Sequence, residues 1–215
     1  MGILVTHKHS DHVRGLEGIS RKHNIPIFTT QKIRKSILSP KSKLSRTCIH
    51  DITLQNEFQL AGFTIEAFPV HHDAPETIGF HISNGYNKIT IVTDLGHICE
   101  TAAAYIKAAN LLVIESNYDE QMLVNGKYPY FLKTRVKSDH GHLGNHQTSA
   151  FLAENISDNL THICLAHLSK NNNTPEIALQ ALQQAFLEKG IAQNNHLHIS
   201  VLKRNGPSDV IRLTR

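Results

Sequence analysis

The chain has 215 residues, a hydrophobic fraction of 40% and a formal net charge of +4, which suit a globular protein with a buried core and favour a polyanionic partner. The three cysteines, Cys48, Cys99 and Cys164, form no CxxC pair, which argues against a disulfide framework and indicates a reducing, cytoplasmic compartment. No apolar run is longer than a strand, so the sequence predicts no membrane span and no membrane partner.

The first half of the chain changes from alternating strands and helices to a β-rich stretch. Short apolar runs bounded by polar residues predict strands at 2–6 and 25–30, helices at 13–23 and 31–38, and an irregular segment at 39–56. After this segment, the sequence predicts a hairpin over 58–70, turning at Ala61 and Gly62, and two more strands at 77–83 and 89–94.

The second half of the chain alternates between helices and buried strands. The pattern predicts a helix at 100–108, a strand at 111–116, short helices between 119 and 137, a helix at 145–155 and a strand at 161–168. The last helix has the clearest ends, because Thr174 can cap it, Pro175 suits its first turn and Gly190 can stop it. Terminal strands are expected at 196–200 and 209–215. We therefore predict one α+β domain spanning residues 1–215.

Histidine is unusually frequent, with 16 in the chain, and four metal-binding side chains crowd into "HKHSDH" at 7–12. If the backbone stays extended beyond the first strand, His7 and His9 point the same way. Asp11 and His12 follow in the turn into the next helix. Imidazole nitrogen and carboxylate oxygen suit Zn²⁺, with Mn²⁺ or Fe²⁺ as alternatives, so the loop predicts a metal site.

Three further metal-binding residues stand where a predicted strand ends. His72 follows "IEAFPV", Asp94 ends "ITIVTD" and His167 follows "THICLA". Each of these residues alone is more typical of a local polar contact than of a metal ligand. Together with the "HKHSDH" loop they predict a site along one edge of a β-sandwich.

The same segments carry a resemblance to a known family. "THKHSDH" resembles the HxHxDH signature of the metallo-β-lactamase superfamily, and the order of His72, Asp94 and His167 is similar to that family's later ligand motifs. "HHDAPETIGFHI", "TDLGHICE", "IESNYDEQML", "SDHGHLGN" and "LAHLSKNNNTPE" resemble its YycJ/WalJ-like branch of metal-dependent hydrolases. The resemblance implies an αββα sandwich. Members of the branch carry strands and a helix before the motif, so the printed chain is expected to lack the first strands.

The resemblance also implies two divalent metal ions, zinc before manganese or iron, and a ligand set for each. One ion would be held by His7, His9 and His72, the other by Asp11, His12 and His167, and Asp94 would bridge them. The branch implies a phosphodiesterase that acts on nucleic acid, DNA before RNA, as a 5′–3′ exonuclease. Two ions that share a hydroxide would generate the nucleophile at neutral pH.

Several other residues are candidates for catalysis or substrate binding. Asp11 could orient the hydroxide and accept its proton, and His142 could protonate the leaving group or serve only as a packing residue. Asp73 could hold a neighbouring ligand in place or lie solvated in a turn. Ser169, Lys170, Asn171 and Asn172 form a donor-rich loop that suits phosphate contact, or an ordinary polar loop before the last helix.

Lys133, Arg135 and Lys137 alternate, so an extended backbone would place three positive charges on one face, although a solvated charged face is the more ordinary reading. Two alternative functions stay open. The same centre could hydrolyse thioesters or other small esters, and the chain could be an inactive metal-binding fragment or an interaction module.

Overall fold

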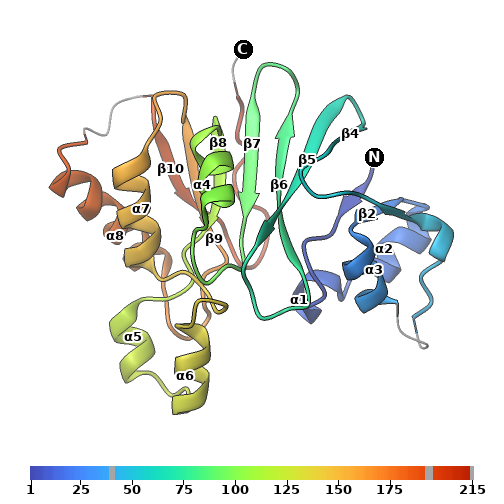
Figure 1. Cartoon of the computed structure of the whole chain (residues 1–215). Coiled ribbons are helices and arrows are strands. Elements are labelled where there is room, and N and C mark those ends of the chain that lie inside the picture. The colour runs from blue at the N-terminus through green and yellow to red at the C-terminus, as the bar shows by residue number, and fades with distance from the viewer. Residues whose placement is uncertain (39–41, 192–195, 214–215) are drawn as a thin grey trace.

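The computed structural model describes residues 1–38, 42–191 and 196–213, and the chain forms two facing β-sheets with helices on both outer sides (Figure 1). The smaller sheet is parallel, in the order β1 (Ile3–Leu4), β2 (Ile27–Thr29) and β3 (Ile49–Asp51). The larger sheet has the order β10-β9-β8-β7-β6-β5-β4. The predicted αββα sandwich and its α+β class are confirmed.

The larger sheet combines a meander with a parallel half. β4 (Glu57–Leu60), β5 (Phe63–Val70), β6 (Thr77–Ser83) and β7 (Lys88–Val92) pair antiparallel through hairpins. β8 (Leu111–Glu115), β9 (His162–Ala166) and β10 (His198–Val201) continue parallel to β7. Ala61 and Gly62 have φ angles of 53° and 84°, the positive values of a tight hairpin turn, which confirms the predicted turn between β4 and β5.

The helices cover the two outer faces and one end of the sandwich. On the side of the smaller sheet lie α1 (Ser10–Val13), α2 (Leu16–His23) and α3 (Gln31–Ile37). On the side of the larger sheet lie α4 (Glu100–Lys107), α7 (Asn145–Asn155) and α8 (Pro175–Glu188). In α8 the Thr174 hydroxyl accepts a hydrogen bond from the Ile177 amide at 3.3 Å, as the predicted cap requires.

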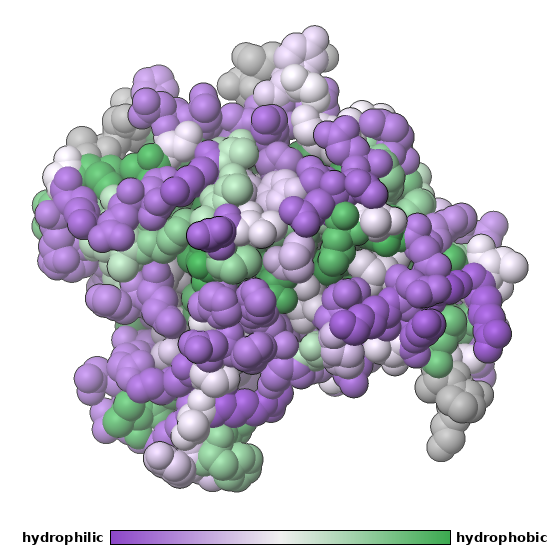
Figure 2. Space-filling model, in the orientation of Figure 1, coloured by the Kyte–Doolittle hydropathy of each residue, from purple (hydrophilic) through white to green (hydrophobic). Residues whose placement is uncertain are grey.

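Two short helices, α5 (Glu120–Asn125) and α6 (Tyr130–Val136), project beyond the end of the sheets (Figure 1). Their inner side chains, including Leu123, Leu132 and Val136, form a small core of their own. Figure 2 shows hydrophobic side chains at the surface of this projection, where Val124 and Phe131 are 49% and 72% exposed.

Strand β5 joins the two main cores because its side chains alternate between its faces. Ile65 and Ala67 pack between the sheets, in a core with residues of β1, β2 and β3. Phe68 and Val70 point the other way, into the core under α4, α7 and α8. The strand therefore couples both halves of the sandwich.

Three predicted segments differ from the structure. The helix predicted at 13–23 is two helices, because a turn at 14–15 lets α1 carry Asp11 and His12 while α2 buries Leu16. The segment 39–56, of which 39–41 lie outside the described residues, contains a 3-10 helix at Arg46–Cys48 and strand β3. Residues 209–213 form no strand, and 214–215 lie outside the described residues. The short helices predicted between 119 and 137 are present, so residues 132–136 do not have the extended backbone considered for the alternating cations, and Leu132 and Val136, four positions apart, both pack onto the small core.

None of the helices in the described ranges has the length and apolar character needed to cross a lipid bilayer.

We expect Gly79→Ala to destabilise the fold by about 1–3 kcal/mol, because an added Cβ overpacks a close-packed site. That Cβ would lie 2.4 Å from Phe68 Cζ, and the Phe68 ring is fixed by stacking on Tyr105 with centroids 4.3 Å apart. Urea unfolding followed by circular dichroism measures the change. Gly18→Ala is the control, because nothing lies within 4 Å of its added Cβ in α2. Equal stability of the two variants would contradict the packing.

Candidate metal centre

The candidate centre lies at one end of the sandwich, where the chain leaves β1, β5, β7 and β9. His7 and His9 follow β1, His72 follows β5, Asp94 follows β7 and His167 follows β9. The Ile78 amide donates to the Thr6 carbonyl at 3.0 Å, which ties the loop after β1 to the larger sheet. Both sheets therefore contribute side chains to one end.

The seven residues that the sequence singled out as ligands lie together in the structure. One ligand atom from each of His7, His9 and His72 lies within 4.8 Å of the others, and the same holds for Asp11, His12 and His167. Asp94 lies between these two groups, and its Oδ1 is 3.8 Å from His72 Nε2 and 3.5 Å from His167 Nε2. Its Oδ2 is 3.3 Å from His12 Nε2. The arrangement has two adjacent three-residue groups with a shared carboxylate.

Three atoms of this cluster lack hydrogen-bond partners although they are buried. They are His7 Nε2, His72 Nε2 and Asp94 Oδ2. An unpaired buried polar atom costs free energy, so three of them pointing into one place indicate a cation-binding site. His72 Nδ1 donates to the Gly141 carbonyl at 2.8 Å, which leaves the lone pair on Nε2. Imidazoles and carboxylates with such lone pairs fit a divalent metal ion.

The electrostatics of the cluster also suit metal binding. Burial lowers the pKa of His7 to about 3, and burial also lowers the pKa of His72, so both rings are neutral near pH 7. Burial alone would raise the pKa of Asp94, but the contact of His12 with its Oδ2 and the charge of His167 hold it well below its usual range. Burial alone would lower the pKa of His167, but its contacts with the Asp11 and Glu115 carboxylates raise it to about 11. The centre thus offers two neutral imidazoles, those of His7 and His72, beside an ionised carboxylate.

Two of these residues have unfavourable backbone conformations. Asp94 has φ of 61° and His167 has φ of 56°, in the left-handed region that residues with a Cβ rarely adopt. The Asn117 side chain donates to the His167 carbonyl at 2.7 Å and helps to hold this conformation. Each such residue costs about 1–3 kcal/mol and is typical of functional sites.

Glu115 is a buried member of the site that the sequence analysis missed. It ends β8, and its Oε1 accepts hydrogen bonds from His142 Nδ1 at 2.8 Å and His167 Nδ1 at 2.6 Å. Its Oε2 accepts from the amides of Leu95 and Leu143 at 3.1 and 3.2 Å. Burial raises the pKa of this carboxyl, but the hydrogen bonds from the two histidines outweigh that effect and keep it ionised. A glutamate that ends an apolar strand was the only sequence signal.

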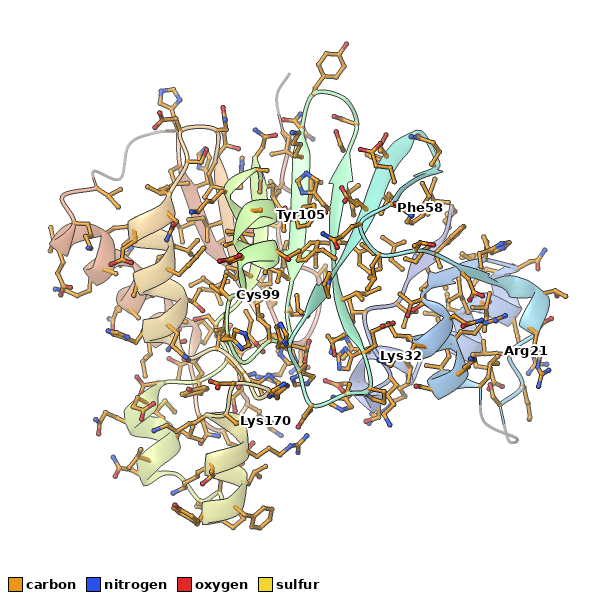
Figure 3. The ribbon with its side chains drawn as sticks, viewed as in Figure 1. Arg21, Lys32, Phe58, Cys99, Tyr105 and Lys170 are labelled. Carbon is orange, nitrogen blue, oxygen red and sulfur yellow. The ribbon has the colours of Figure 1, made fainter. Side chains whose placement is uncertain are left out.

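A cavity of about 380 Å³ opens beside the second group of ligands. Asp11, His142 and His167 line it together with Lys170 and Arg135. Figure 3 shows Lys170 at the end of the sheets, next to the projection formed by α5 and α6. The cavity is large enough for a small organic ligand or one nucleotide unit.

The four residues of the predicted substrate loop lie in different environments. Ser169 and Lys170 line the cavity. Asn171 is exposed, and its side-chain amide lies 3.4 Å from the Tyr128 hydroxyl. Asn172 is 1% exposed and does not line the cavity, and its side chain donates to the Ser169 hydroxyl at 3.4 Å. Ser169 and Lys170 can therefore contact a ligand in the cavity, whereas Asn171 and Asn172 do not line it.

The alternating cations at 133–137 do not form one extended face, because they lie on helix α6. Arg135 Nε donates to the Asp73 carboxylate, and Lys137 pairs with Glu120. Lys133 Nζ donates to the Val124 carbonyl at 2.6 Å. Of the three, Arg135 lines the cavity.

Sequence comparison relates the chain to known proteins. The family model of the "Beta-lactamase superfamily domain" matches residues 1–161. The chain is 35% identical over 189 residues to "Exodeoxyribonuclease YycJ" of Bacillus anthracis, covering 88% of this chain and 72% of that protein. It is 30% identical over 195 residues to "Exodeoxyribonuclease WalJ" of Streptococcus pneumoniae serotype 2, with the same coverages of 88% and 72%.

Structural comparison finds the same fold in solved proteins. The metallo-beta-lactamase fold protein YhfI from Bacillus subtilis matches with a TM-score of 0.68 and 14% identity, over 94% of this chain and 74% of that chain. Zn(2+)-bound PqqB from Methylobacterium extorquens matches with a TM-score of 0.67 and 19% identity, over 97% of this chain and 73% of that chain. At these identities the matches show the shared fold alone.

We expect Glu115→Gln to lower metal affinity about 10–100-fold, because a ligand loses the hydrogen bond that orients it. The new amide group would also face N–H donors, which costs about 1–3 kcal/mol of unfolding free energy. Metal titration and thermal unfolding measure both effects. Glu154→Gln is the control, since Glu154 is exposed and pairs with Lys189 on the surface. The assigned role of Glu115 is wrong if the two variants behave alike.

We expect metal-free protein to lose stability as the pH falls below 6.5, in part through His7. The folded pKa of His7 is about 3 against an ordinary value of 6.5, so the unfolded chain takes up the proton first. The uptake of one such proton changes the free energy of unfolding by at most about 1.4 kcal/mol per pH unit. Urea unfolding of chelator-treated wild type and His7→Gln between pH 5 and 8 measures it. Parallel curves for the two proteins would contradict the burial of a neutral His7.

Proposed function

The chain belongs to the β-lactamase superfamily and is a metal-dependent hydrolase, and we propose that it cleaves the phosphodiester bonds of DNA as an exonuclease. The observation that carries the proposal is the pair of adjacent ligand groups around Asp94, next to a cavity lined in part by basic residues. Two curated relatives at 35% and 30% identity bear the name exodeoxyribonuclease, which supports DNA as the substrate. Digestion from the 5′ end is the polarity implied by the YycJ/WalJ-like motifs.

We propose that two divalent ions bind, one at His7, His9 and His72 and one at Asp11, His12 and His167, with Asp94 shared. Zn²⁺ is the first candidate and Mn²⁺ or Fe²⁺ the alternatives, because the donors are imidazoles and carboxylates without a thiolate. When bound, such a pair of ions activates water at neutral pH and neutralises charge on the phosphoryl oxygens.

We propose that two side chains move protons during hydrolysis. The Asp11 carboxylate is 64% exposed, lines the cavity and lies 3.7 Å from His167 Nε2, so it can orient the attacking water and accept its proton. His142 lines the same cavity and donates Nδ1–H to Glu115. Burial lowers the pKa of His142, but the Glu115 carboxylate outweighs it and raises the pKa above its ordinary value. A protonated His142 can supply the proton that the leaving oxygen needs.

The cavity would hold the phosphates of the substrate. Ser169 and Lys170 lie on its wall with Arg135 and Arg204, so a hydroxyl, an ammonium and two guanidinium groups face one space. Such donors contact phosphate oxygens and carry no base preference. Asn172 is buried, so we assign it to the support of the loop. Residues 1–215 are proposed as one domain, because β5 contributes side chains to both main cores.

We expect wild type to degrade 5′-phosphorylated duplex DNA and to hold about two metal ions per chain. His9→Ala should lower metal content and nuclease rate, the rate by about 100-fold or more, because losing a ligand costs at least as much as losing its support. Metal analysis and a labelled-DNA assay measure both, with RNA of the same sequence, bis-p-nitrophenyl phosphate and a glutathione thioester as competing substrates.

His23→Ala is the matched control for this experiment, because His23 is an exposed histidine at the end of α2. It should keep full metal content and activity. The proposal is overturned if chelator-treated protein degrades DNA at the wild-type rate, or if the thioester is hydrolysed and the phosphodiesters are not.

A further inference from the structure

Asp73 lies among the candidate ligands although the HxHxDH pattern and the later ligand motifs do not include it. It directly follows His72, and its side chain is 24% exposed. Its Oδ1 is 3.2 Å from His72 Nε2 and 3.6 Å from His9 Nε2. These are the two nitrogen atoms that the first proposed ion would use.

The separations around Asp73 are those of donor atoms that share one metal ion. With bonds of about 2.1 Å, two donors at a right angle are about 3.0 Å apart and two at a tetrahedral angle about 3.4 Å. Asp73 Oδ1 is closer to His72 Nε2 than Asp94 Oδ1 is, at 3.2 Å against 3.8 Å. By these distances, Asp73 lies at least as close to the proposed position of this ion as the shared Asp94 does.

The protonation of His72 points to the same conclusion. Its Nδ1 donates to the Gly141 carbonyl, which can only accept, so Nε2 of the neutral ring carries a lone pair. His72 Nε2 is buried and has no hydrogen-bond partner in the structure. A lone pair and a carboxylate oxygen at 3.2 Å repel each other unless a cation lies between them.

The second carboxylate oxygen of Asp73 is already fixed. Arg135 Nε donates to Oδ2, and Arg135 comes from helix α6 across the cavity. Carboxylates that bind metals are commonly held by such a hydrogen bond through the oxygen that does not bind. Arg135 therefore leaves Oδ1 directed at the histidine nitrogens.

We infer that Asp73 is a further ligand of the ion held by His7, His9 and His72, which adds a hard oxygen donor to that half of the centre. The inference rests on the proposed two-metal function. Oxygen donors suit Mn²⁺ more than an all-imidazole set does, so Asp73 strengthens Mn²⁺ binding more than Zn²⁺ binding.

The test measures metal binding to the folded, metal-depleted full chain, by competition with a chromophoric chelator for Zn²⁺ and Mn²⁺ and by Mn²⁺ electron paramagnetic resonance. Asp73→Asn should weaken Mn²⁺ binding about 100-fold or more and Zn²⁺ binding about tenfold. For Mn²⁺ this loss exceeds the 10–100-fold range expected when a residue only supports a ligand. Circular dichroism confirms that each variant is folded.

Two further variants separate a ligand from a structural brace. Arg135→Gln removes the partner of Asp73 but keeps its Oδ1, so it should weaken Mn²⁺ binding by about tenfold, clearly less than Asp73→Asn does. Asp51→Asn is the matched control, because Asp51 also pairs with an arginine Nε, that of Arg34, at 3.0 Å on strand β3. It should leave both affinities unchanged.

The outcomes are distinct. If wild type holds two ions and Asp73→Asn binds both metals as tightly, or if Arg135→Gln matches its loss, the ligand role of Asp73 is wrong and the two-metal centre stands. If wild type holds fewer than two ions at saturating Mn²⁺ or Zn²⁺, the proposed centre and this inference are both overturned.

Discussion

The structure depends on one electrostatic constraint: the buried carboxylate of Asp94 lies within 4.0 Å of four imidazole rings, and its Oδ2 has no hydrogen-bond partner. Burying a charge without a hydrogen-bonded partner is expensive. A divalent cation on either side of the carboxylate removes that cost. The positive φ of Asp94, the unpaired nitrogens and the convergence of strand ends from both sheets all follow from bringing these groups together.

Glu115 connects residues of the site to the rest of the fold through its hydrogen bonds. One of its oxygens holds His142 and His167, and the other accepts from backbone amides in the loops after β7 and before α7. Three loops from separate parts of the chain are thereby tied to the end of β8. The proposed proton donor His142 and the proposed metal ligand His167 both bind Glu115, so the positions of both depend on the same buried carboxylate.

The resemblance of the sequence motifs to a known family implied the αββα sandwich. The sequence also predicted that the seven ligand candidates lie together, because the "HKHSDH" loop follows an apolar strand and the other three candidates stand at the ends of apolar strands. It could not identify Glu115, since a single glutamate at the end of an apolar run carries no spacing signal. It predicted short helices between 119 and 137 but left open an extended face with Arg135, because a short alternation of charges fits a strand as well as a helix. The contacts of Leu132 and Val136 with the small core formed by α5 and α6 favour the helical conformation of this segment. The pairing of Arg135 with Asp73, 62 residues away, is a property of the fold.

The central claim is that Asp94 lies between two metal ions. Anomalous X-ray diffraction from crystals grown with Zn²⁺ or Mn²⁺ tests it most directly. The account predicts two anomalous peaks within bonding distance of Asp94, one among His7, His9 and His72 and one among Asp11, His12 and His167. No peak at this end of the sandwich, or one peak that Asp94 does not contact, would contradict it.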